Sequence, residues 1–200
     1  MRGAQRRPGV SPGRAPDPEW ALRVALTGTP GTGKSSVADA LPRRIRREEV
    51  AEAALRLGAG HRNGRAVHVD LDALAKRLKR EGGLGGPQVL VGHLAHLLPV
   101  RHVVLLRCDP RVVERRLARA RRGTRVSRRE NASAEATDAI LFEALERAQV
   151  VYEIDTTRRS PGSVAREVTR WMEGAREPRF GTVDWLSVPA VTAQLLAPIR

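Results

Sequence analysis

The sequence offers almost no sulfur chemistry, because its 200 residues include one cysteine, Cys108. A single thiol cannot form an internal disulfide, which excludes the small secreted folds that disulfides hold together. Cys108 lies in an apolar run typical of a strand, so we expect a buried and inert thiol. With 41% hydrophobic and 29% charged residues, the chain is instead typical of a globular domain with its own core.

Long apolar segments are missing as well. No run approaches the ~20 residues that span a bilayer, and the N-terminus lacks the apolar stretch of a secretory signal. We therefore expect no membrane partner and a cytoplasmic location. Residues 1–18 are rich in Arg, Pro and Gly and are expected to form a disordered leader.

Lysine is scarce too, since 33 of the 36 basic residues are arginine. The formal net charge of +14 favours polyanionic ligands such as a nucleotide, RNA or the ribosome, although base composition of the coding DNA can produce the same bias. Residues 111–129 contain nine arginines against one acid, Glu114. A stretch of one sign predicts a polyanion site, either a nucleotide lid or a generic RNA-binding face.

Apolar periodicity predicts alternating strands and helices. Strands are expected at 22–26, 89–91, 102–106 and 150–154, and helices at 33–40, 70–80, from Pro110, 132–149 and 163–172. Residues 45–57 fit either one helix or a helix-strand-helix arrangement. The alternation predicts a parallel sheet covered on both faces, with the ligand beyond the carboxyl ends of its strands. This domain would cover 19–173, and the irregular tail 174–200 would pack back on it through Phe180 and Trp185.

The strongest motif is Gly28-Thr-Pro-Gly-Thr-Gly-Lys-Ser35, which matches G-x-x-x-x-G-K-[ST] between a strand and a helix. Backbone N–H groups of such a loop hold phosphate oxygens. Lys34 would reach the β- and γ-phosphates, and the Ser35 hydroxyl would bind Mg²⁺. A glycine-rich turn with a chance lysine is the alternative, and the scarcity of lysine argues against it.

Several further segments, in order and with matching spacing over about 21–187, resemble one family. They are Leu26-Thr-Gly-Thr-Pro-Gly-Thr-Gly-Lys-Ser-Ser36, Val69-Asp-Leu-Asp-Ala-Leu74, Val91-Gly-His-Leu-Ala-His-Leu-Leu-Pro99, Val103-Val-Leu-Leu-Arg-Cys108, Glu130-Asn131 followed by Glu135, Tyr152-Glu-Ile-Asp-Thr-Thr157, and 176–185. The chain is similar in these segments to the small archaeal adenylate kinase family, which is related to eukaryotic nuclear adenylate kinases tied to small-ribosomal-subunit maturation.

The resemblance implies a P-loop NTPase fold, a three-layer α/β sandwich with a parallel sheet, of the nucleoside-monophosphate-kinase type with a short lid. ATP and Mg²⁺ are the implied cofactors. The residues it places on ATP phosphates and Mg²⁺ are Gly28, Gly31, Thr32, Gly33, Lys34, Ser35 and Ser36. The monophosphate segment would lie near 48–71 and the lid near 121–131. Arg122 would touch ATP, His93 would lie close to the transferred phosphate, and Asp155 would order the adenine-side loop or simply end its strand.

Three departures from the family pattern bear on activity. Val91 runs straight into Gly92-His93, without the acidic residue that the family carries there for the Mg²⁺ shell. Mg²⁺ would then rely on Ser35, phosphates and water, or on Asp70, Asp72 or Asp109. The acidic stretch of the monophosphate segment is replaced by His61-Arg-Asn-Gly-Arg65, and the lid lysine by Ser127, with nearby arginines as imperfect substitutes.

Two functions follow as hypotheses. The first is a broad-specificity nucleoside monophosphate kinase, converting ATP and AMP into two ADP, with an ATPase activity and a role in maturation of the small ribosomal subunit. The second is an ATP-dependent ribosome-assembly factor with decayed kinase activity that binds pre-rRNA or a small-subunit protein. A phosphate-loop kinase of another small metabolite has no positive sign in the sequence.

Overall fold

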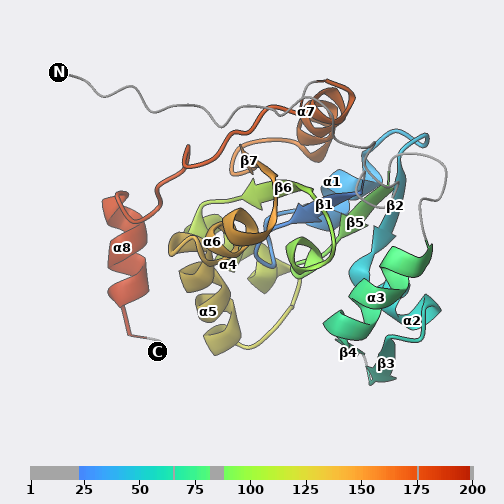
Figure 1. The fold of residues 1–200 in the computed structure, drawn as a ribbon. Coiled ribbons are helices and arrows are strands. Elements are labelled where there is room, and N and C mark those ends of the chain that lie inside the picture. Colours follow the sequence, from blue (N-terminus) through green and yellow to red (C-terminus); the bar gives the residue numbers. More distant parts are fainter. Residues whose placement is uncertain (1–22, 65, 82–87, 175, 199–200) are drawn as a thin grey trace.

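The first apolar run forms strand β1 (Val24–Thr27), which lies at the centre of a five-stranded sheet (Figure 1). The other strands are β2 (Arg46–Glu49), β5 (Gln88–Val91), β6 (His102–Arg107) and β7 (Val150–Asp155). Their order is β2-β5-β1-β6-β7, and every pairing is parallel. The carboxyl ends of all five strands therefore meet at one edge, where the predicted phosphate loop begins. The computed structural model describes residues 23–64, 66–81, 88–174 and 176–198.

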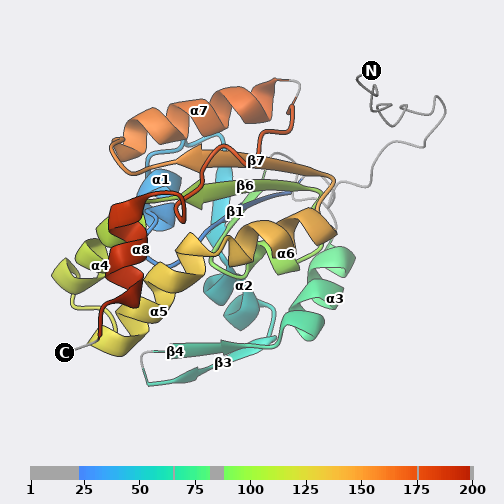
Figure 2. The same cartoon turned by 90° about the vertical axis from the view of Figure 1, so that its left-hand side faces the viewer.

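Helices cover both faces of the sheet, and the predicted three-layer α/β sandwich is confirmed (Figure 2). One face carries α1 (Lys34–Asp39) and α7 (Pro161–Glu173), which pack on Val24 and Leu26. The other face carries α2 (Val50–Arg56), α3 (Leu71–Glu81), the short 3-10 helix η2 (Ala95–Leu97) and α6 (Ala139–Arg147). The three inner strands, β1, β5 and β6, are buried on both sides, which explains why their sequences are short, nearly continuous apolar runs.

The region that the sequence left open, 45–57, is a strand followed by a helix, so a single helix over that range is wrong. β2 is made of Arg46-Arg-Glu-Glu49, which carries no apolar pattern. It is a strand because it pairs with β5 at the edge of the sheet, a contact distant in sequence. After α2 the chain forms an antiparallel hairpin of β3 (Gly60–Asn63) and β4 (Ala66–Val69).

The helix predicted over 132–149 is two helices, α5 (Arg125–Ala136) and α6, separated at Thr137 and Asp138. Asp138 adopts a left-handed conformation, with φ of 57°, which ends one helix and redirects the chain into the next. Its carboxylate pairs with Arg107 on β6. A partner remote in sequence therefore fixes the break, and helical periodicity alone does not reveal it. The preceding helix, α4 (Pro110–Arg119), begins at the predicted proline.

The tail runs back along the edge of the sheet and ends in a helix, α8 (Pro189–Leu196), where an irregular segment was expected. Glu153 N donates to Arg179 O at 2.6 Å, and Arg179 N donates to Val151 O at 3.0 Å, so the tail adds a short bridge to β7. α8 then lies against α4 and α5 (Figure 2). Sequence periodicity could not place α8, because its apolar residues have no single buried side.

No helix in the described part of the chain combines the length and the apolar character that a membrane crossing requires. The expected leader at 1–18 lies outside the described residues.

Candidate active site

The loop between β1 and α1 contains three glycines with a backbone that other residues rarely adopt. Gly28, Gly31 and Gly33 have φ of 139°, 96° and 100°. At Gly28 space is lacking as well, because a Cβ there would lie 2.3 Å from the carbonyl oxygen of Leu106 on β6. The loop is therefore pressed against the end of the neighbouring strand, and its course is fixed by both sterics and backbone conformation.

Lys34 begins α1, and its ammonium group turns back onto the loop. Nζ donates to the carbonyl oxygens of Gly28 at 2.7 Å and Thr29 at 3.0 Å. Burial lowers the pKa of Lys34 to about 8, because desolvation disfavours the charged form. A buried ammonium held by neutral carbonyls gains strongly from a bound anion, which is what a phosphate group would supply.

A cavity of about 600 Å³ opens beside the loop, within the size range of small-molecule sites. The structure brings seven of the sequence-predicted site residues together in its lining: Gly31, Gly33, Lys34, Ser35, Ser36, His93 and Arg122.

Three predicted residues, Gly28, Thr32 and Asp155, lie outside this lining. Thr32 is buried within the loop, where its hydroxyl donates to Thr29 O at 2.9 Å and its carbonyl accepts from Thr156 Oγ1 at 2.8 Å. Asp155 accepts from Thr157 N at 2.8 Å and from Thr157 Oγ1 at 2.5 Å, so it orders the loop after β7. Thr32 therefore shapes the loop from within, whereas Asp155 is exposed and lines a separate cavity together with Asp109 and Thr157.

Glu49 lines the same cavity, and sequence analysis missed it. It ends β2, and its Oε1 accepts a hydrogen bond from Ser35 Oγ at 3.1 Å. Burial raises the pKa of Glu49, against the opposing effects of the Ser35 hydrogen bond and the Lys34 charge. The signal that could have found it is the pairing of β2 with β5, which the sequence does not display.

The acids suggested from sequence as Mg²⁺ ligands are placed elsewhere. Asp70 accepts from Ala73 N at 2.9 Å in the first turn of α3, and Asp109 accepts from Arg111 N at 2.8 Å as the N-cap of α4. Neither these two nor Asp72 is among the residues that line the cavity. In the described part of the chain, Glu49 is the acid that lines it.

The arginines of 111–129 divide between the site and the fold. Arg122 and Arg116 line the cavity, and the guanidinium of Arg116 donates to Gly31 O at 3.3 Å and to Thr156 O at 3.2 Å. Arg116 thus joins the phosphate loop to the loop after β7, a role that sequence analysis did not assign. Arg129 instead bonds carbonyl oxygens of Gln194 and Ala197 at the end of α8.

The two histidines after β5 have different surroundings. His93 lines the cavity. Its pKa is lowered mainly by burial and further by the charge of Lys34, so its imidazole is neutral at pH 7. His96 is buried, with Nδ1 at 3.0 Å from Thr27 Oγ1 and Nε2 at 2.8 Å from Glu143 Oε2. Thr27 also donates to His93 O at 3.3 Å. His96 therefore positions the turn that carries His93.

Comparison with known proteins identifies the family. A family model described as "AAA domain" matches residues 24–138. A protein of Thermococcus onnurineus named "Putative adenylate kinase" is 40% identical over 164 residues, covering 81% of this chain and 90% of its own length. A protein of the same name from Archaeoglobus fulgidus is 43% identical over 173 residues, covering 83% and 93%. The chain belongs to this archaeal adenylate kinase family.

Similarity to solved structures is weaker. An uncharacterized protein from Eubacterium ventriosum covers 76% of this chain and 98% of its own, with 9% identity and a TM-score of 0.49. A likeness of that size bears on no property of the site.

For a member of the adenylate kinase family, ATP with Mg²⁺ is the expected ligand, and the donors at the loop fit it. The described residues contain no group of three or more His, Cys, Asp or Glu side chains that could hold a metal ion. The Ser35 hydroxyl and the Glu49 carboxylate are hard oxygen donors of the kind that Mg²⁺ prefers. Mg²⁺ commonly takes one or two such ligands and completes its shell with phosphates and water. The donor set therefore fits a metal that arrives with the nucleotide.

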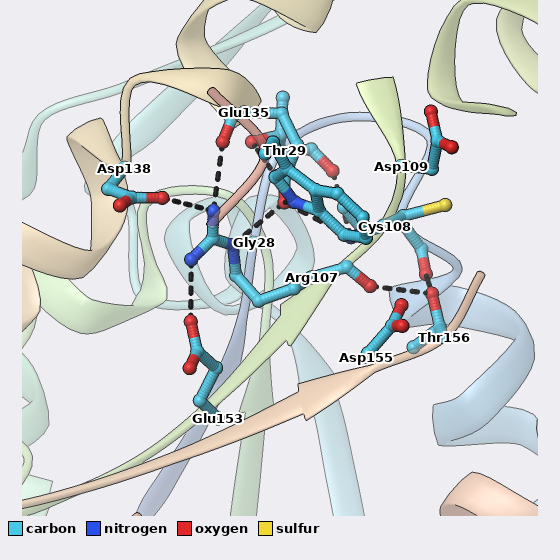
Figure 3. A network of polar contacts seen from close by, with 12 residues as sticks. Gly28, Thr29, Arg107, Cys108, Asp109, Glu135, Asp138, Glu153, Asp155 and Thr156 are labelled. Atoms are coloured by element: carbon cyan, nitrogen blue, oxygen red, sulfur yellow. Dashed lines mark hydrogen bonds and ion pairs between the residues drawn. The ribbon is translucent and has the colours of Figure 1, made fainter. Parts of the chain in front are cut away.

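Behind the phosphate loop of this kinase-family chain lies a buried polar cluster centred on Arg107, at the end of β6 (Figure 3). The guanidinium donates to Glu135 on α5 at 2.8 Å and to Glu153 on β7 at 2.5 Å, and it also pairs with Asp138. Arg107, Glu135 and Glu153 are each at most 2% exposed. Although burial acts to lower it, the neighbouring carboxylates raise the pKa of Arg107.

The same cluster holds the loop and the tail. Thr29 of the phosphate loop donates to Glu135 Oε2 at 2.6 Å, and Trp185 of the tail donates to Glu135 Oε1 at 3.3 Å. Thr182 donates its N–H to Glu153 Oε2 at 2.8 Å. Glu135 is part of a segment that carries the family resemblance, but its partners come from three separate parts of the chain: the phosphate loop, the end of β6 and the tail.

Replacing Gly28 by alanine is expected to disturb the loop. The added Cβ meets the Leu106 carbonyl, and φ is unfavourable, so we expect a loss of stability of about 1–3 kcal/mol and at least tenfold weaker ATP binding. Gly64→Ala is the matched control, because Gly64 has φ of 59° but nothing within 4 Å. Calorimetric titration with ATP beside denaturant unfolding measures both effects. Unaltered ATP affinity in Gly28→Ala would contradict the assigned course of the loop.

Replacing Arg107 by methionine leaves two carboxylates buried without their cation, which is expected to cost about 3–5 kcal/mol at pH 7. Burial already raises the pKa of Glu135. When the pKa of a glutamate is higher in the folded than in the unfolded state, the protein loses stability as the pH rises from the ordinary pKa through the raised pKa. The deficit relative to wild type should therefore shrink between pH 7 and pH 5. Denaturant unfolding at both pH values measures it, with Arg44→Met, at the exposed ion pair with Glu173, as the control. An equal loss of stability at both pH values would contradict the pairing of the Arg107 cation with buried carboxylates.

Proposed function

We propose that the protein is a broad-specificity nucleoside monophosphate kinase that transfers the γ-phosphoryl group of ATP to AMP, giving two ADP, and hydrolyses ATP when no acceptor is bound. The observation that carries the proposal is the cavity beside the phosphate loop. Its lining combines a buried ammonium, Lys34, with two guanidinium groups, Arg116 and Arg122, and a neutral imidazole, His93. Phosphoryl transfer depends on positioning and positive charge around the migrating group.

In the proposed reaction, an oxygen of the AMP phosphate attacks the γ-phosphorus, and the bond to the β–γ bridging oxygen breaks. The electron pair leaves with ADP; water in place of AMP gives hydrolysis. Lys34 would exchange its two carbonyl partners for phosphate oxygens. Mg²⁺ bound with ATP would neutralise phosphate charge beside Ser35. Arg122, which is exposed at the cavity rim, would close on the nucleotide as part of the lid at 121–131.

The acceptor is assigned to the segment 48–71, which the structure builds from the end of β2, α2 and the β3–β4 hairpin. The hairpin carries no acid; its exposed strand residues include His61 and Arg62, and His61 stacks on His68 with ring centroids 5.2 Å apart. A basic hairpin suits a phosphate-bearing acceptor by charge.

The same basic character favours the second candidate, a ribosome-assembly factor in which ATP turnover switches contact with pre-rRNA or a small-subunit protein. The net charge of +14 greatly exceeds what one nucleotide needs for neutralisation. The two functions are compatible within one chain, and they differ in whether AMP affects ATP turnover.

A coupled assay of ADP production with ATP and Mg²⁺, with and without AMP, tests the kinase. We expect AMP to raise the ADP formed per ATP consumed toward twice the value for hydrolysis alone, because the acceptor itself becomes ADP. Lys34→Ala should lower the rate at least a hundredfold, because the mutation removes a positive charge from the phosphates. Turnover that ignores AMP would favour the assembly factor, and turnover unchanged in Lys34→Ala would overturn both functions.

Binding to a labelled small-subunit rRNA fragment at increasing salt tests the second candidate. Neutralised RNA phosphates release counterions, so affinity should fall at least tenfold between about 50 and 200 mM salt if several arginines contact the backbone. Fluorescence anisotropy measures it, with a neutral peptide nucleic acid of the same sequence as control. Affinity that is flat with salt, or equal for the neutral control, would argue against rRNA binding.

A further inference from the structure

Glu49 stands at the phosphate loop although nothing in its local sequence marks it as a site residue. It ends β2 and lines the cavity beside Lys34, Ser35 and His93. Its carboxylate accepts from the Ser35 hydroxyl at 3.1 Å, the group that the loop motif places on Mg²⁺. A carboxylate held against that hydroxyl, inside a cavity built for phosphates, repels the ligand unless a cation lies between them.

The strand register explains how Glu49 reaches Ser35. Glu49 lies opposite Val91 in the parallel pairing of β2 with β5, and Leu26 lies opposite Val91 on the other side. Residues paired in this way share one face of a sheet. Val91 and Leu26 pack into the core beneath α1, so Glu49 also faces α1, whose first turn carries Ser35.

Val91, which directly precedes Gly92 and His93, is buried. An acid at that position would lie on the same face of the sheet as Glu49. The carboxylate is thus present at the site, one strand further toward the edge of the sheet. Two other acids near the loop have protein partners. Asp109 caps α4 and pairs with Arg111, and Glu135 pairs with Arg107.

We propose that Glu49 is the protein carboxylate that holds Mg²⁺ at this site, acting together with the Ser35 hydroxyl. This inference rests on the proposed function, because the metal arrives with the nucleotide. Ser35 Oγ donates a hydrogen bond to Glu49 Oε1, so hydroxyl and carboxylate lie side by side. With metal, the cation would lie between the phosphates and Glu49, which would turn a repulsive contact into an attractive one. Glu49 is then a metal-positioning residue, absent from the motif and supplied by strand pairing.

Binding of Mn²⁺, a spectroscopic substitute for Mg²⁺, to the full chain saturated with ADP tests the proposal. Electron paramagnetic resonance of free Mn²⁺ gives the metal affinity independently of turnover. We expect Glu49→Gln to weaken Mn²⁺ binding about 10–100-fold, the range typical for carboxylates that orient a metal shell. ADP affinity measured in EDTA should stay within twofold of wild type or rise slightly, because a negative charge near the phosphates has been removed.

Glu52→Gln is the matched control. Glu52 lies in the first turn of α2, is exposed, and its charge acts on Glu49, so this variant removes the same charge nearby without touching Ser35. It should keep Mn²⁺ affinity within twofold. If Mn²⁺ binding weakens equally in both variants, the cause is the general electrostatic field and the assignment is overturned. An unchanged Mn²⁺ affinity in Glu49→Gln would overturn it as well.

A second variant restores the carboxylate from the neighbouring strand. Adding Val91→Asp to Glu49→Gln places an acid opposite the lost one, and recovery of at least tenfold in Mn²⁺ affinity is expected. Because Val91 is buried, thermal unfolding of the double variant is recorded first. If it does not fold, Glu49→Asp takes its place and should keep most of the metal affinity that Glu49→Gln loses.

The outcomes separate the two proposals. If the wild-type chain binds no ADP, the proposed function and this inference are both overturned. If it binds ADP but its Mn²⁺ affinity does not respond to Glu49→Gln, this inference alone is overturned.

Discussion

The geometry of the site depends on one buried cation, Arg107. It sits at the carboxyl end of β6, directly beside the phosphate loop, and its donors hold acids from α5, β7 and the turn before α6. A charge buried this deeply costs several kcal/mol unless it is paired and hydrogen-bonded, so each acid has a defined place. Glu135 passes that constraint to the loop through Thr29. The position of the phosphate loop is therefore set from behind by electrostatics as well as by its glycines.

The same cluster explains the shape of the chain after β6. The helix expected over 132–149 breaks at Asp138, because the left-handed turn there lets its carboxylate meet Arg107. The tail follows β7 because Thr182 reaches Glu153, and it continues to α8 because Trp185 reaches Glu135. The candidate lid includes the first half of α5, and α8 packs against α5. Both helices are thus anchored to the residues that anchor the loop. Glu135 is the shared contact, because it lies on α5 and accepts hydrogen bonds from both Thr29 of the loop and Trp185 of the tail.

Features decided within a few residues could be predicted from the sequence, and features decided by remote partners could not. The motif at 28–35, the buried strands and the helix beginning at Pro110 follow from local periodicity and turn chemistry, and the structure confirms them. β2, in contrast, is a polar segment that becomes a strand only by pairing with β5, so its last residue, Glu49, gave no sign of entering the site. Arg116 looked like one arginine among nine, because only the packed structure brings it between two loops.

The distribution of charge shows why composition is a poor guide to this site. The arginine-rich stretch at 111–129 suggests a dense positive lid, yet Arg111 pairs with Asp109 and Arg129 holds the end of α8. The cavity itself is lined by two arginines of that stretch, with Lys34 as the buried cation and Glu49 as the opposing acid. A site that combines three cations with one acid binds phosphates less strongly than a purely basic one, but it gives a divalent cation a place beside them. In the proposed kinase, this acid distinguishes a site for phosphoryl transfer from a surface that only attracts polyanions.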